Sequence, residues 1–158
     1  MEKGEVSKFQ GLLVGQIIAS AVGALLLAVS DCGGYYYMKY YSGIKVWGDI
    51  YLGSGILASV LILTGMAGLL VALMAAVNSI KAKENLTADL LKQNARRSII
   101  AAGFTASLAA LGALIFAVTS TIDQTDWWLD SGFYGAFIGG LLTVFFGRIM
   151  VNSELMLP

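Results

Sequence analysis

Histidine is absent from this sequence of 158 residues, and cysteine and proline each occur only once. Without histidine, the chain lacks the commonest metal ligand and the usual acid–base group near neutral pH. The single cysteine, Cys32, excludes an intramolecular disulfide and any metal site built from several cysteines. It leaves open a free thiol or a disulfide to another chain. We therefore expect no metal ion and no other cofactor.

Charge is also scarce. Only 13% of the residues are charged, whereas soluble domains average about 25%. Ten basic residues balance ten acidic ones, and a nucleic-acid surface needs a clustered basic stripe, so we expect no nucleic-acid partner. Hydrophobic residues make up 58% of the chain. This composition is typical of a membrane protein.

Four long windows without ionisable residues divide the chain. A helix of about 20 apolar residues crosses the ~30 Å hydrocarbon core of a bilayer, and its backbone groups must be satisfied within the segment. The windows predict an all-α integral membrane protein, in which residues 1–158 form one four-transmembrane-helix bundle. The expected spans are 9–30, 50–79, 98–122 and 131–151. They leave outer loops at 31–49 and 123–130 and a cytoplasmic loop at 80–97, where Thr87 is expected to cap the next helix.

Lysine and arginine are unevenly distributed between the two sides that these spans define. Positive residues collect in the cytoplasmic loops of membrane proteins. Eight basic residues lie in the N-terminal tail, the middle loop and the C-terminal end, whereas only Lys39 and Lys45 lie in the outer loops. This bias predicts that both termini are cytoplasmic, in a protein of the cell membrane.

Small residues recur every four positions in the predicted spans, which places them on one face of each helix. Close backbone approach at such faces is a main source of helix association in lipid. The glycines that we select as packing or oligomer contacts are Gly11, Gly15, Gly23, Gly135, Gly139, Gly140 and Gly147. The last span carries two adjacent rows, around Gly135 and around Gly140. Either both rows pack inside the chain, or one of them contacts another subunit.

The first outer loop, "DCGGYYYMKYYSGIKVWGDIY", is rich in aromatic residues. They are Tyr35, Tyr36, Tyr37, Tyr40, Tyr41, Trp47 and Tyr51. The β-forming residues on both sides of Ser42-Gly43 predict a short β-hairpin that turns there. The aromatic residues either anchor at the membrane surface or form a contact patch for another protein.

A small four-span chain with an outer hairpin resembles claudin-like proteins in general architecture. Their first loop contains Trp-Gly-Leu-Trp followed by two cysteines, whereas this chain has Trp47-Gly48-Asp49 and one distant cysteine. The resemblance therefore implies no function.

The second outer loop, "TIDQTDWWLDSG", contains Asp123, Asp126 and Asp130 around two tryptophans. Three carboxylates either form a solvated acidic rim or hold a cation such as Ca²⁺, which prefers oxygen ligands. On the cytoplasmic side, the basic residues Arg96, Arg97 and Arg148 are candidates for contact with anionic lipid headgroups. Membrane lipids and other membrane subunits, including further copies of the chain, are the partners that we expect.

The deep parts of the spans contain no ionisable residue, which weighs against a pump or a proton-coupled transporter. Their main polar side chains besides serine, Gln16, Thr64, Thr105 and Thr143, are expected to serve packing. No set of catalytic residues can be named, so we expect no enzyme. We expect a non-enzymatic protein that acts by assembly, as a structural or accessory subunit of a larger membrane complex or homo-oligomer. The alternative is a small oligomeric channel or transporter with an acidic outer mouth.

Overall fold

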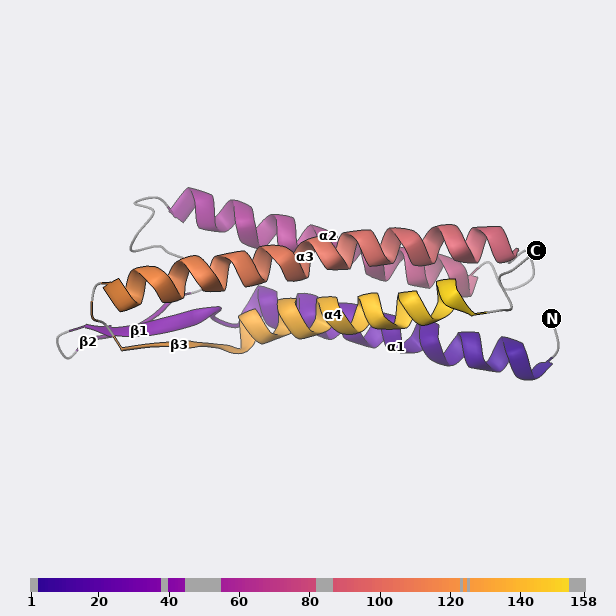
Figure 1. The fold of residues 1–158 in the computed structure, drawn as a ribbon, viewed down its shortest axis with the longest axis horizontal. Coiled ribbons are helices and arrows are strands. Elements are labelled where there is room, and N and C mark those ends of the chain that lie inside the picture. The colour runs from indigo at the N-terminus through magenta and orange to yellow at the C-terminus, as the bar shows by residue number, and fades with distance from the viewer. Residues whose placement is uncertain are drawn as a thin grey trace.

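In a computed structural model, the described part of the chain forms four long helices and three strands (Figure 1). The structure describes residues 3–37, 40–44, 55–81, 87–122, 124 and 126–153. The helices are α1 (Lys3–Val29), α2 (Gly55–Lys81), α3 (Ala88–Ile122) and α4 (Ser131–Asn152). The strands are β1 (Gly33–Tyr37), β2 (Tyr40–Ile44) and β3 (Asp126–Leu129).

All four helices are long and apolar enough to cross a membrane, so the predicted four-helix architecture is confirmed. The helix α3 begins at Ala88, directly after Thr87 and ten residues before the expected membrane span at 98–122. The N–H of Leu90 donates to Thr87 Oγ1 at 3.2 Å, which confirms Thr87 as the cap of α3. Residues 88–97, between the expected spans, are therefore part of α3. With 35 residues, α3 is about 52 Å long at ~1.5 Å per residue, well over the hydrocarbon core of a bilayer.

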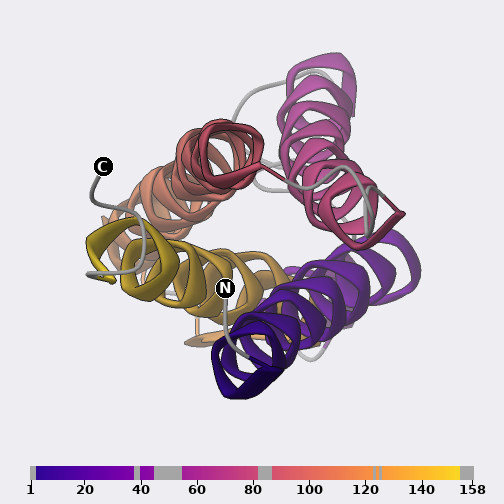
Figure 2. The ribbon, with the colours of Figure 1, turned by 90° about the vertical axis from the view of Figure 1, so that its right-hand side faces the viewer.

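The helices form a ring in chain order (Figure 2). In this ring α1 and α3 each pack against both α2 and α4. The start of α1 and the end of α4 lie at one end of the bundle, which we call the terminal end (Figure 1). The strands lie at the other, the sheet end, beside the last turns of α3 (Figure 1).

Small residues let the helix backbones meet in the middle of the bundle. A Cβ atom placed on Gly23 of α1 would lie 2.7 Å from the carbonyl oxygen of Gly135 in α4. On another side of α4, a Cβ atom on Gly140 would lie 2.8 Å from the carbonyl oxygen of Ala102 in α3. Within the chain, Gly135 and Gly139 of α4 are thus covered by α1, and Gly140 is covered by α3.

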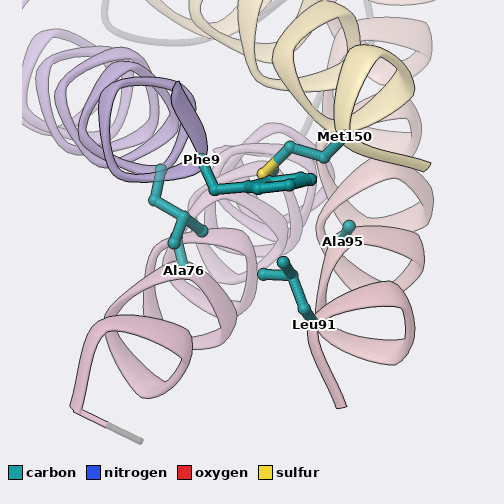
Figure 3. Packing of buried hydrophobic residues seen from close by; sticks show 6 residues of the cluster. Phe9, Ala76, Leu91, Ala95 and Met150 are labelled. Atoms are coloured by element: carbon teal, nitrogen blue, oxygen red, sulfur yellow. The ribbon is translucent and has the colours of Figure 1, made fainter. Parts of the chain in front are cut away.

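Larger side chains close the two ends of the bundle. At the terminal end, the Phe9 ring from α1 lies against the Met150 side chain from α4, above Leu91 of α3 (Figure 3). At the sheet end, a second buried cluster contains Leu27, Cys32, Ala109, Phe116, Phe133 and Ala136. Large apolar contacts therefore lie at the two ends, on either side of a middle built from small residues.

The exterior of the helices carries large apolar side chains. Ile18 is 57% exposed, Leu114 61% and Phe145 57%. A helix on the surface of a water-soluble bundle instead turns a polar face outward. In lipid there is no force that drives apolar side chains inward. The interior of small residues and the apolar exterior are thus the arrangement of a helical bundle in a membrane.

The strands form one sheet in the order β2-β1-β3, with both pairs antiparallel. The turn that we expected at Ser42-Gly43 is wrong, because these two residues lie inside β2, opposite Tyr35 and Gly34. The β-propensity of the tyrosine run outweighs the turn preference of Ser-Gly. The two strands are separated by residues 38–39, which lie outside the described residues.

Candidate interaction surfaces

The sheet is fastened to the ends of α1 and α4 by backbone contacts. The N–H of Asp130 donates to the carbonyl oxygen of Cys32 at 3.0 Å, and the N–H of Gly132 donates to that of Asp31 at 2.9 Å. A Cβ atom on Gly132 would lie 2.8 Å from the Asp31 oxygen, so this approach requires glycine. The start of α4 and the end of α1 are therefore joined directly below the sheet.

The two tryptophans of β3 lie on opposite sides of the strand, as neighbouring residues in a strand do. Trp127 Nε1 donates to Thr121 Oγ1 at 3.3 Å, and its ring meets that of Phe116 edge-on, with centroids 6.2 Å apart. The ring of Trp128 lies over Gly34, where a Cβ atom would come within 2.6 Å of Trp128 Cε2. Trp127 thus holds the sheet against α3, and Trp128 covers the other side of the strand.

Cys32 lies at the same junction and is a free, fully buried thiol. Its burial, followed by the negative charges of Asp31 and Asp130, raises the pKa of Cys32 to about 12. A cysteine of another chain reaches this sulfur only if the junction opens. The structure therefore supports the free thiol over the interchain disulfide.

The two described carboxylates of the possible cation site, Asp126 and Asp130, are not brought together. Asp126 begins β3 and Asp130 follows its end, so their Cα atoms are about 14 Å apart at ~3.4 Å per residue. Ligands of one Ca²⁺ ion lie within ~2.6 Å of it. Asp130 instead caps α4, accepting a hydrogen bond from the N–H of Ser131 at 2.6 Å. Asp123 lies outside the described residues, and among the described ones no group of His, Cys, Asp and Glu is suited to a metal ion.

Buried polar side chains join the helices across the bundle. Three of them link α2 to α3: Ser98 Oγ donates to the Ala72 carbonyl oxygen at 3.2 Å, Thr105 Oγ1 to that of Gly65 at 2.9 Å, and Asn94 Nδ2 to Ser79 Oγ at 3.0 Å. The sequence predicted a packing role for threonines in the spans. It missed the contributions of Ser98, Asn94 and Ser79, since a lone serine or asparagine carries no information about its partner.

Gln16 provides the corresponding link between α1 and α4. It is fully buried, and its Nε2 donates to the carbonyl oxygen of Thr143 at 3.1 Å. Its Oε1 has no hydrogen-bond partner among the described residues. An unsatisfied buried acceptor costs about 1–3 kcal/mol. Gln16 therefore links α1 to α4 through its Nε2, and its Oε1 is available to accept a hydrogen bond inside the bundle.

Six of the seven predicted glycine contacts touch a neighbouring helix. They are Gly15, Gly23, Gly135, Gly139, Gly140 and Gly147. Gly11 differs, because a Cβ atom there would meet nothing within 4 Å. Periodicity thus identified the packing face of these helices, except for its first position.

The predicted aromatic patch is divided between two strands and the part of the chain that is not described. Tyr35, Tyr36 and Tyr37 form most of β1, and Tyr40 and Tyr41 begin β2. Tyr36 and Tyr41 are register partners. Trp47 and Tyr51 lie outside the described residues. The sequence missed β3, although Trp-Trp-Leu is a run of β-formers.

The three arginines that we expected to meet lipid headgroups are all exposed, on α3 and α4 near the terminal end.

Neither a family model, a curated protein nor a solved structure matches the chain. Function is therefore inferred from the geometry alone.

Proposed function

We propose that this chain is an integral membrane protein that acts by assembly, as a structural or accessory subunit of a larger membrane complex or homo-oligomer. Its apolar exterior faces lipid, its termini are cytoplasmic, and the sheet stands on the outer side of the cell membrane. No enzymatic activity is assigned. The observation that carries the proposal is the construction of the sheet from two segments far apart in the chain.

A fixed sheet is more than membrane anchoring requires. Aromatic side chains anchor at the headgroup level without an ordered backbone. A protein contact benefits from order, because a preorganised surface loses less conformational entropy on binding. Here β3 is paired to β1, and the junction below them is held by Asp130 and Gly132. This ordered backbone supports a role of the sheet in binding another protein.

The outer strands of the sheet supply a mode of contact. Among the described strands, β2 and β3 are the edges, and edge strands present backbone groups that add a further strand from another chain. Tyrosine and tryptophan are frequent anchors of protein interfaces. We therefore place the contact on the sheet, over β1, β2 and Trp128.

The glycine rows of α4 are a poorer choice for this contact. Gly139 and Gly140 already face α1 and α3, so their replacement by leucine is expected to damage the fold along with any assembly. A test of the proposal must therefore change the sheet surface and leave the helix contacts intact.

Asp126 provides such a test, because it is exposed at the start of β3. Asp126→Lys is expected to lower the affinity of the assembly at least tenfold, which is about 1.4 kcal/mol. The matched control is Asp89→Lys, the same charge change at an exposed residue on the other end of the bundle. The readout is the mass of the particle extracted into native nanodiscs. Equal behaviour of the two variants, or loss with Asp89→Lys alone, contradicts the sheet as the contact.

A second candidate function is a small oligomeric channel or transporter. The Oε1 atom of buried Gln16 favours it, because this oxygen has no hydrogen-bond partner in the described part of the chain and can accept a hydrogen bond from a polar solute inside the bundle. Ion or solute flux into liposomes that falls in Gln16→Leu, and again in Asp126→Asn at the outer mouth, supports transport. Absence of flux with the wild-type protein rejects it.

A further inference from the structure

We propose that Arg96 and Arg148 together bind the phosphate of one anionic phospholipid, at the exposed seam between α3 and α4. The inference depends on the proposed membrane insertion and is independent of the proposed assembly. It places one lipid beside Arg96 and Arg148 and gives Arg97 no part in binding it.

Helix contacts place the two arginines at similar heights along the bundle. α3 and α4 run in opposite directions (Figure 1). Arg148 follows Gly147, where a Cβ atom would lie 2.7 Å from Ile99 Cγ1. Arg96 precedes Ile99 by three residues, which is about 4.5 Å along α3. The two arginines are therefore within about one helical turn of each other in height.

Helix periodicity places both arginines on the outer flank of the same seam. A Cβ atom on Gly103 of α3 would lie 3.6 Å from Val144 Cγ2 of α4. Arg148 is four residues from Val144, and residues four apart share a helix face. Arg96 is one heptad before Gly103, an angular offset of only about 20°. Both arginines are exposed, one on each side of the seam.

Arg97 is exposed as well, but it lies about 100° further around α3. This rotation carries it away from α4, so it does not share a ligand with Arg148. The described carboxylate nearest to Arg96 along α3 is that of Asp89, seven residues or about 10 Å away. Arg96 and Arg148 thus present two positive charges to one region. The described acidic residue nearest to Arg96 on α3, Asp89, is two turns away.

Two guanidinium groups suit a phosphate, because each offers paired N–H donors that match its oxygens. The surface next to them suits an acyl chain. Ile100 on α3 is 72% exposed and Leu141 on α4 is 47% exposed, and Gly103 between them has no side chain. A free phosphate would use only the charges. The continuity of charge and apolar surface favours a phospholipid. Anionic lipids are concentrated on the cytoplasmic side, where basic residues near the surface attract them.

The test measures lipid retention by the full chain with native mass spectrometry, after exchange into detergent with phosphatidylglycerol or phosphatidylcholine. The wild-type protein is expected to retain one phosphatidylglycerol at least fivefold more strongly than phosphatidylcholine. Arg96→Gln and Arg148→Gln should each remove this preference. Arg97→Gln, the same substitution one residue away, should keep it.

Three outcomes overturn the proposal. The first is equal loss in Arg97→Gln and Arg96→Gln, which indicates diffuse attraction to a positive surface. The second is equal retention of the two lipids by the wild-type protein. The third is displacement of the lipid by inorganic phosphate at millimolar concentration, which indicates an anion site without lipid specificity.

Lysine variants keep the test valid if glutamine impairs folding. Arg96→Lys retains the charge but loses the paired donors, so an intermediate preference is expected. A preference equal to that of the wild-type protein contradicts shared phosphate binding by the two guanidinium groups. Particle mass measured on Arg96→Gln should be unchanged, which distinguishes loss of the lipid from loss of the assembly.

Discussion

Replacement of Gly139 by alanine tests the close contact between α1 and α4. A Cβ atom on Gly139 would lie 2.8 Å from the carbonyl oxygen of Ala19 and 3.0 Å from the Cα atom of Gly23. Both neighbours are backbone atoms, so no side-chain rotation relieves the clash. One helix must move away from the other.

The expected change in the free energy of unfolding is the sum of two opposing effects. Overpacking of a well-packed interior costs about 1–3 kcal/mol, and alanine is a better helix former than glycine by about 1 kcal/mol. We therefore predict that Gly139→Ala lowers the free energy of unfolding by up to about 2 kcal/mol relative to the wild-type protein, and by about 1–3 kcal/mol relative to Gly11→Ala, which gains the helix preference without overpacking. The movement should also weaken the bond from Gln16 Nε2 to the Thr143 carbonyl oxygen, which spans the same pair of helices.

Two controls use the same substitution at glycines without a tight contact. Gly11 has nothing within 4 Å of its Cβ position, and Gly103 has only an ordinary contact at 3.6 Å. Both alanine variants should be as stable as the wild-type protein or more stable. The assay is reversible unfolding in mixed detergent micelles, followed by tryptophan fluorescence. If Gly139→Ala is as stable as Gly11→Ala, the close backbone contact between α1 and α4 is wrong.

Three further predictions concern buried polar groups. Gln16→Leu removes the buried Oε1, which lacks a described partner, and also removes the hydrogen bond to the Thr143 carbonyl oxygen. The free energy of unfolding should therefore be unchanged or rise by up to about 2 kcal/mol in the same assay. A loss of about 2 kcal/mol or more contradicts this. Thr105→Val removes the bond to the Gly65 carbonyl oxygen and should cost about 0.6–1.7 kcal/mol, the range of such bonds between membrane helices, whereas no loss refutes the bond. The raised pKa of Cys32, about 12, keeps its thiol neutral in the folded protein, so its contribution to stability is present below pH ~9 and is lost as pH rises toward 12. Iodoacetamide at pH 8.5 should therefore label Cys32 only after denaturation, and rapid labelling of the native protein contradicts its burial.

The helices could be predicted from the sequence because their signal is local. Uncharged windows of sufficient length identify membrane-spanning helices. Thr87 identified the start of α3 because a cap acts on the next turn of the same helix. Glycine periodicity likewise identified a packing face. It could not identify the neighbour, because Gly135 and Gly139 of α4 meet α1 whereas Gly140 meets α3, and only the fold decides this.

The site features that the sequence missed depend on residues far apart in the chain. The Gln16 bond joins positions 127 residues apart, and the pairing of β3 with β1 joins two separate loops. Neither is visible in a local pattern. The sequence could not distinguish Arg96 from Arg97. Only the packing of α4 against α3 shows that Arg96 lies beside the seam between these helices and that Arg97 does not.

We propose that this chain acts by assembly through its sheet on the outer side of the membrane. Assembly can be measured as the mass of the wild-type particle extracted from its membrane into native nanodiscs, with photo-cross-linkers placed at Tyr36 and Trp128. We expect a defined particle larger than one chain, with cross-links from these positions to a second polypeptide or a second copy. A particle that contains a single chain and forms no such cross-links would contradict it.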